Sequence, residues 1–140
     1  MITKTGSAKW QGAIKDGKGE VSTQSGALKS QPYGFATRFE DQPGTNPEEL
    51  IGAAHASCFS MALSKALGDA GVTDVTIETT SAISLDKEGD GFAVKKAALT
   101  STVSGQGDKS AIEQAANGAK DNCPISKLLN TEITLDLTIA

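Results

Sequence analysis

TNPEELIGAAHASCFSMALSKAL, residues 45–67, is the stretch that decides the fold of this chain. Asn46 can cap a helix, Pro47 suits the first helical position, and two glutamates follow in the first turn. From position 50 onward nearly every residue is apolar or small. A helix that is apolar almost all round is buried by its surroundings, so the sequence predicts a buried helix with Cys58 near its middle.

This stretch has about the number of apolar positions that a membrane span needs, but His55, Lys65 and the glutamates argue against one. The first twelve residues, MITKTGSAKWQG, contain no apolar run and do not resemble a signal peptide. We therefore expect a cytoplasmic protein without a membrane partner. In that compartment two cysteines are expected to be thiols or a transient redox pair.

The composition predicts a single globular domain over residues 1–140. The net charge is −4, no basic cluster is visible, and the chain has four Phe, one Tyr and one Trp. A protein of this kind has neither the positive surface nor the stacking aromatics that bind nucleic acid. We expect no nucleic-acid partner.

The remaining pattern predicts strands, a hairpin, a second helix and a closing strand. Residues 74–85 alternate between inward and outward positions and residues 92–104 return, which predicts a β-hairpin. An apolar stripe over 112–119 predicts a helix, and Pro124 suits the start of a further helical piece. Alternation over 133–139 predicts the last strand. Four short strands are expected near the N-terminus, at 8–12, 19–23, 27–28 and 35–39.

This order predicts an α+β fold with a mainly antiparallel sheet. Phe35, Thr37 and Phe39 would share one face of the fourth short strand, which would put Arg38 on the other face. The long helix is expected to stop near Gly68 or Gly71, because glycine suits the C-terminal cap.

Cys58 and Cys123 are the candidate chemical groups. A buried cysteine is often only a small apolar residue, and it becomes reactive only where a cation or a helix N-terminus stabilises its thiolate. His55, three residues before Cys58, is one local cation, and Arg38 is the better one because it stays charged at any working pH. Cys123 would cap the helical turn that Pro124 begins. The 65 positions between the cysteines do not show whether they meet.

Glu48 can pair with an arginine, but it precedes Cys58 by ten residues, about 15 Å along an unbroken helix. If both serve one site, either the helix is broken or Glu48 acts on the Cys58 of a second subunit, and we favour the second arrangement. His55 and Cys58 have a spacing that metal ligands can use, yet one histidine and two cysteines supply only three soft ligands. No metal site is expected.

Four motifs resemble the OsmC/Ohr family of thiol peroxidases, with the OsmC branch closer: PYGFATRF (32–39), NPEELIGAAHASCFSMAL (46–63), NCPISKLL (122–129) and EITLDLTI (132–139). The resemblance implies an α+β fold of mainly antiparallel sheets wrapped around two long central helices in an intertwined homodimer. By position, Cys58 matches the family's peroxidatic cysteine, Cys123 its resolving cysteine, Arg38 its catalytic arginine and Glu48 the paired glutamate.

The activity that the resemblance implies is an antioxidant one, the reduction of organic hydroperoxides, and of hydrogen peroxide less well, to alcohol and water. Cys58 would become a sulfenic acid and then a disulfide with Cys123, which an external dithiol of lipoyl type or another kind would reduce. No cofactor is required. The alternatives are a non-catalytic, stress-induced dimer that binds an apolar ligand or senses oxidants, and another thiol enzyme such as a thioester hydrolase.

Overall fold

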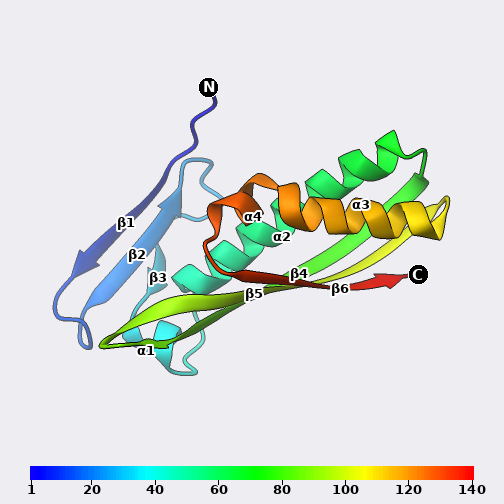
Figure 1. Ribbon diagram of the computed structural model, residues 1–140. Helices are drawn as coiled ribbons and strands as arrows, with labels where there is room; N and C mark the ends of the chain where they lie inside the picture. The colour runs from blue at the N-terminus through cyan, green and yellow to red at the C-terminus, as the bar shows by residue number, and fades with distance from the viewer. The chain divides into compact units, whose positions relative to one another are not determined.

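A computed structural model describes residues 1–140, which divide into two compact units, Met1–Leu50 and Ile51–Ala140. The first unit is built on an antiparallel sheet in the order β1-β2-β3 (Figure 1). Its strands are β1 (Gly6–Gln11), β2 (Lys18–Thr23) and β3 (Gln31–Tyr33), and α1 (Phe35–Phe39) follows them. The first two predicted strands are thereby confirmed with small shifts in their bounds.

Gly19 allows the rings of Trp10 and Tyr33 to approach across this sheet. The two ring centroids lie 5.8 Å apart, on either side of β2. A Cβ atom at position 19 would lie 2.5 Å from the Tyr33 ring and 2.9 Å from the Trp10 ring, closer than any side chain tolerates. The glycine is therefore required by packing.

The predicted strand at 35–39 is wrong, because these residues form the short helix α1. The Thr37 hydroxyl accepts a hydrogen bond from the Gly34 N–H at 2.9 Å and donates one to the Gly34 carbonyl at 3.0 Å, which closes a helical turn. Phe35 and Phe39, expected on one face of a strand, meet equally well at a helical spacing of four, with ring centroids 5.0 Å apart. Their spacing fits both periods, and the Thr37 hydroxyl selects the helix.

The predicted strand at 27–28 is also wrong. Thr23 closes this segment as a loop, because its N–H donates to the Leu28 carbonyl at 2.9 Å and its hydroxyl accepts from the Leu28 N–H at 3.1 Å. Gly26 turns the chain there with φ at +79°. The third strand of the sheet forms instead at β3.

The long helix α2 (Pro47–Asp69) begins and ends as its sequence predicts. Asn46 Oδ1 accepts the Glu49 N–H at 2.9 Å, and at the other end the Val72 N–H reaches the Leu67 carbonyl at 2.9 Å across Gly71, whose φ is +79°. Within the single chain the helix is not buried all round. One stripe is buried, at Gly52, His55, Phe59, Leu63 and Leu67.

The opposite face of α2 is open in the single chain. Ala53, Ala54 and Ser57 are exposed there, and Met61 is 76% exposed. By length and composition alone α2 could also cross a membrane, a test that the core helices of soluble proteins pass as well. Its buried stripe is part of the main hydrophobic core.

The second unit places α2 and α3 (Lys109–Asn122) side by side on one face of a three-stranded sheet (Figure 1). The predicted hairpin is confirmed as β4 (Thr73–Glu88) and β5 (Gly91–Gln106), which pair antiparallel. The last strand, β6 (Glu132–Ile139), pairs parallel to β5 after a crossover through α3 and α4 (Pro124–Leu128). The α+β class is thereby confirmed. The core between the layers is formed by Phe59, Leu63, Leu67, Leu99, Val103, Ile112 and Ala116.

Candidate active site

The break between α3 and α4 fixes Cys123 inside the core. Cys123 ends α3 through its N–H, which donates to the Ala119 carbonyl at 3.0 Å, and it begins α4 through its sulfur, which accepts the Ser126 N–H at 3.3 Å. Pro124 occupies the first position of α4, where a missing N–H costs nothing. The cap predicted for Cys123 is thereby confirmed, and its side chain is fully buried.

The two cysteines meet, although 65 positions separate them. The side chains of Cys58 and Cys123 are hydrogen-bonded to each other, and both are free thiols. Cys58 also receives a hydrogen bond from the backbone N–H of Ile125, the residue before Ser126. Two successive N–H groups of α4 therefore point at the two sulfurs, one at each.

The local surroundings raise the pKa of the Cys58 thiol. Burial is the main cause, because it disfavours the charged thiolate, and the hydrogen bond and charge of Cys123 act in the same direction. The Ile125 N–H lowers the pKa, but it does not outweigh burial. Within this set of groups Cys58 is a thiol at neutral pH, and a thiolate requires a cation in addition.

Arg38 and Glu48 form a second pair, within the first unit. The Arg38 Nη2 lies 2.8 Å from Glu48 Oε1, and its Nε lies 3.2 Å from both carboxylate oxygens. The Glu48 side chain is 13% exposed and that of Arg38 is 38% exposed. Asn46 joins the two helices that carry them, because its Nδ2 donates to the Thr37 carbonyl at 3.2 Å. The guanidinium is thus held as a fork, with its remaining nitrogen free to bind another group.

An apolar cavity of about 270 Å³ lies beside Arg38. Arg38 contributes the only charged side chain of its lining, and the guanidinium also stacks over the Phe39 ring at 5.3 Å. A ligand with a polar end and an apolar body fits such a lining. The other large side chains that line the cavity are Trp10, Ile14, Tyr33, Phe35 and Phe39.

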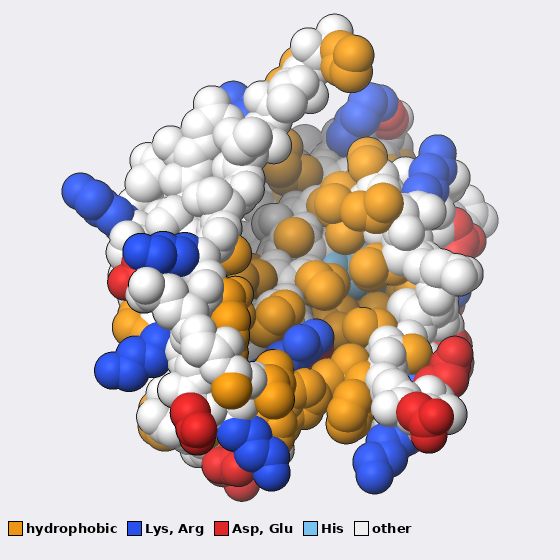
Figure 2. Space-filling model, turned by 90° about the vertical axis from the view of Figure 1, so that its left-hand side faces the viewer, with side chains coloured by type: hydrophobic (Ala, Val, Ile, Leu, Met, Phe, Trp, Pro, Cys, Tyr) orange, Lys and Arg blue, Asp and Glu red, His pale blue; other side chains and the backbone are white.

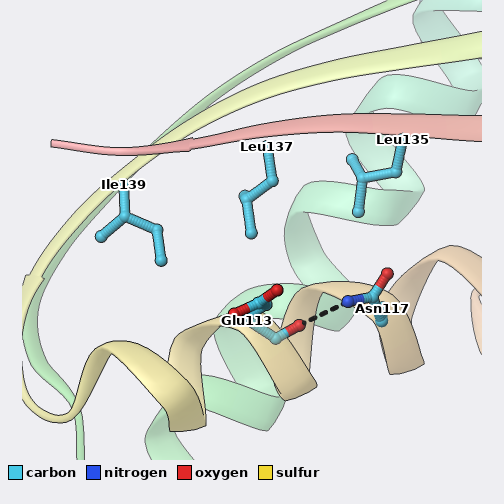
Figure 3. Close-up of a pocket in the computed structure, with 5 residues that line it drawn as sticks. All are labelled: Glu113, Asn117, Leu135, Leu137 and Ile139. Atoms are coloured by element: carbon cyan, nitrogen blue, oxygen red, sulfur yellow. Dashed lines mark hydrogen bonds between the residues drawn. The ribbon is translucent and has the colours of Figure 1, made fainter.

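A larger cavity of about 440 Å³ lies between α3 and β6, where Leu135, Leu137 and Ile139 point from the strand toward the helix (Figure 3). Glu113 and Asn117 close it from α3. The lining has no thiol and no cation. It therefore cannot activate a peroxide.

His55 is not the cation that its spacing suggested. It is fully buried, with Nδ1 2.8 Å from the Ser81 hydroxyl and Nε2 2.9 Å from the Ser126 hydroxyl. Burial lowers the pKa of His55, so its imidazole is neutral at neutral pH. Ser126 in turn lies 3.1 Å from the Cys123 sulfur. The sequence analysis did not single out Ser126, although a serine three residues after a capping residue is a usual contact of the cap.

His55 and the charged side chains are the groups that a metal ion or a nucleic acid would contact. Both ring nitrogens of His55 are engaged by serines, and no three His, Cys, Asp or Glu side chains gather around one point. Lys and Arg side chains on the face shown in Figure 2 stand singly, several of them beside Asp or Glu. The reactive groups that the core brings together are the thiols of Cys58 and Cys123.

Comparison with known proteins identifies the family of this chain. Residues 39–138 match the family described as OsmC-like protein. The chain is 59% identical over 136 residues to peroxiredoxin OsmC of Escherichia coli K12, covering 96% of this chain and 95% of that protein. This chain belongs to the OsmC family.

Other relatives of this OsmC-family protein are more distant. Organic hydroperoxide resistance protein OhrB of Bacillus subtilis is 28% identical over 122 residues, 85% of this chain and 88% of that protein. The crystal structure of OhrB superposes with a TM-score of 0.70 and covers 96% of this chain and 98% of that one. The OsmC-family fold is therefore shown by sequence and by structure. Glu48, Cys58 and Cys123 lie inside the family match, and Arg38 lies one residue before it.

Proposed function

We propose that this OsmC-family protein is a cysteine-based peroxidase that reduces organic hydroperoxides to alcohols. The observation that carries the proposal is the contact between two free thiols, Cys58 and Cys123. A protein that only binds an apolar ligand has no use for a second thiol at this place. The relatives named peroxiredoxin and organic hydroperoxide resistance protein support the same chemistry.

Cys58 is the attacking group in this proposal, because it is partly exposed whereas Cys123 is fully buried. Its thiolate attacks the peroxide, the O–O bond breaks, and the alkoxide leaves and takes a proton to become the alcohol. Cys58 is left as a sulfenic acid. Cys123 then condenses with it, which forms the disulfide and releases water.

Arg38 and Glu48 supply the charge that this mechanism needs. The pKa of Cys58 is raised by its own surroundings, so a guanidinium beside the sulfur would restore the thiolate and bind the developing alkoxide. Glu48 holds the fork of Arg38 in one orientation. The apolar cavity beside Arg38 favours a hydroperoxide with an alkyl or aryl body over hydrogen peroxide.

We further propose a homodimer with a site shared between subunits. Helix α2 is unbroken from Pro47 to Asp69, which supports a site shared between subunits over one formed by a break in the helix. Ten residues of helix separate them by about 15 Å. The open apolar face of α2 at Ala53 and Met61 would be covered by a second copy. We retain the chain 1–140 as one functional domain, located in the cytoplasm.

The reductant in this proposal is an external dithiol, because a dithiol can open the Cys58–Cys123 disulfide and leave as a disulfide itself. The test is a peroxide-consumption assay with dithiothreitol or reduced lipoamide, comparing cumene hydroperoxide with hydrogen peroxide. We expect faster turnover of cumene hydroperoxide, and none in Cys58→Ser, whose circular dichroism should match the wild type. Turnover by Cys58→Ser at the wild-type rate would exclude the proposal and favour an oxidant-independent role.

A further inference from the structure

A chain of hydrogen bonds runs through the core from β4 to the buried thiol. It joins the Ser81 hydroxyl, the two ring nitrogens of His55, the Ser126 hydroxyl and the Cys123 sulfur, with successive distances of 2.8, 2.9 and 3.1 Å. His55, Ser126 and Cys123 are each at most 5% exposed. No water is needed to connect these groups, because each side chain touches the next.

We propose that His55 and Ser126 form a proton relay that takes the thiol proton from Cys123 as this cysteine attacks the oxidised Cys58. The inference rests on the proposed peroxidase function and adds two residues to its second step. Ser126 touches the reacting sulfur. His55 acts through Ser126 and is a positioning residue in this sense.

The proton moves along the hydrogen-bonded series of Cys123, Ser126 and His55, in which each group donates to the next. In the proposed starting state the Cys123 S–H donates to the Ser126 hydroxyl, 3.1 Å away, and the Ser126 O–H donates to Nε2 of His55, 2.9 Å away. As the new S–S bond forms and the S–O bond of the sulfenic acid breaks, the thiol proton passes to Ser126 and the hydroxyl proton passes to His55. Hydroxide leaves Cys58. The imidazolium of His55 then returns its proton through Ser126 to this hydroxide, which becomes water. The sum is one sulfenic acid and one thiol converted to one disulfide and one water.

Two features of these hydrogen-bonded groups favour the transfer of the thiol proton. Ser81 Oγ lies 2.8 Å from Nδ1 of His55. In the proposed relay this hydroxyl accepts the Nδ1–H, which leaves Nε2 as the nitrogen that receives a proton from Ser126. The Ser126 N–H donates to the Cys123 sulfur at 3.3 Å and stabilises the thiolate as it forms. The backbone and the side chain of one serine therefore serve the same sulfur.

The surroundings of the relay keep the imidazole of His55 in its neutral form, which has a lone pair that can accept a proton. Burial is the one cause that lowers the pKa of His55, and no charged side chain of the elements packed against it contributes. The titratable groups at the other end are Cys123 and Cys58, which act on each other. Cys123 is fully buried, so near neutral pH an acceptor within the core takes its proton more readily than the scarce hydroxide of the solvent does.

The test separates the second step from peroxide chemistry. Dithionitrobenzoate labels Cys58 in the full chain, because this thiol is partly exposed, and one thionitrobenzoate is released. Cys123 then attacks the mixed disulfide, which forms the Cys58–Cys123 disulfide and releases the second thionitrobenzoate together with the Cys123 proton. The rate of the second release, followed by absorbance from pH 6 to pH 10, reports on the relay even if the protein consumes no hydroperoxide.

Ser126→Ala and His55→Gln are the informative variants. Glutamine can keep a hydrogen bond to Ser126 but cannot hold a proton. We expect each variant to slow the second release about 10²-fold at neutral pH, the lower range of general-base effects. The rate should return toward wild type as pH rises, because hydroxide from solvent then takes the thiol proton in place of the missing acceptor. Ser126→Thr, which keeps the hydroxyl, should restore the neutral-pH rate.

Ser101→Ala is the matched control, because Ser101 is also a buried serine, bonded to Thr79 at 2.9 Å and outside the relay. It should leave the second release unchanged. A wild-type rate in both Ser126→Ala and His55→Gln overturns the relay, and so does a loss that is equal at every pH, which indicates a structural role. If Ser126→Ala does not fold, the comparison of His55→Gln with Ser126→Thr decides. If the second release depends on Ser126 and His55 as expected but the protein consumes no hydroperoxide, the proposed function is refuted and the relay is not.

Discussion

The Arg38 guanidinium holds the Glu48 carboxylate through two nitrogens, Nη2 at 2.8 Å and Nε at 3.2 Å from Oε1. This geometry uses the planar fork of arginine and leaves its other terminal nitrogen available. A lysine at position 38 would offer a single point charge in its place. The pair therefore has the form of a positioned cation rather than of an incidental surface ion pair.

Arg38→Ala should slow alkylation of Cys58 by iodoacetamide about tenfold near neutral pH. The physical reason is that loss of a neighbouring cation raises a thiol pKa by about one unit, and only the thiolate reacts. The measurement is the pH profile of alkylation in a Cys123→Ser background. Glu49→Gln is the control, because Glu49 begins the same helix without an ion pair to Arg38. An alkylation profile that Arg38→Ala does not shift would remove Arg38 from the mechanism.

Cys123→Ser should stop the cycle after one oxidation. Without the second thiol the sulfenic acid of Cys58 persists, and it either reacts with dimedone or proceeds to sulfinic acid. Mass spectrometry after one equivalent of cumene hydroperoxide should detect the dimedone adduct on Cys58 in this variant and a disulfide in the wild type. Sustained turnover by Cys123→Ser with dithiothreitol would show that an external thiol can replace Cys123.

Gly52→Ala should destabilise the protein by about 1–3 kcal/mol, the usual cost of overpacking. A Cβ at position 52 would lie 2.7 Å from the Ser81 carbonyl oxygen, a backbone atom that cannot turn away. Gly68→Ala is the control in the same helix, since a Cβ there meets no atom within 4 Å. Gly68→Ala should stabilise by about 0.5–1 kcal/mol through helix propensity. Urea denaturation of both variants checks the opposite signs.

His55 should make the protein less stable as pH falls below about 6.5, the ordinary histidine value. Burial lowers the pKa of His55 in the folded state, so below that pH the unfolded chain binds more protons and is favoured. Stability therefore rises with pH through this window and levels off above it. His55 is the only histidine in the chain. In His55→Gln the midpoint of urea unfolding should therefore change less between pH 5 and pH 7 than it does in the wild type. If the midpoint of His55→Gln still changes with pH as in the wild type, the pH dependence is due to carboxylates and not to His55.

The sequence predicted best where one physical cause acts alone. The alternation of β4, the Asn46 cap and the Pro124 start are each set by local chemistry. Prediction failed at Phe35–Phe39, where the apolar spacing fits both a strand and a helix and a hydroxyl contact selects between them. It also does not indicate which face of α2 lies open in the single chain, because hydropathy does not distinguish burial within one chain from burial against a second.

The features of the site also divide into those that the sequence predicts and those that only the three-dimensional structure shows. The cap at Cys123 follows from residue type and spacing, whereas the pairing of Glu48 with Arg38 was implied by the resemblance to the family. The role of His55 does not, because its partners Ser81 and Ser126 lie 26 and 71 positions away. A serine is so common that only three-dimensional contact distinguishes the two that matter.

The parallel pairing of β6 with β5 has a consequence for biosynthesis. β5 leaves the ribosome before α3, α4 and β6, so its outer edge waits unpaired until the whole crossover has been made. That edge carries Ala97, Leu99 and Val103, an alternating apolar row that another nascent chain could join. Slow or interrupted translation beyond position 106 therefore lengthens the time during which the unpaired edge of β5 can pair with another chain and start aggregation.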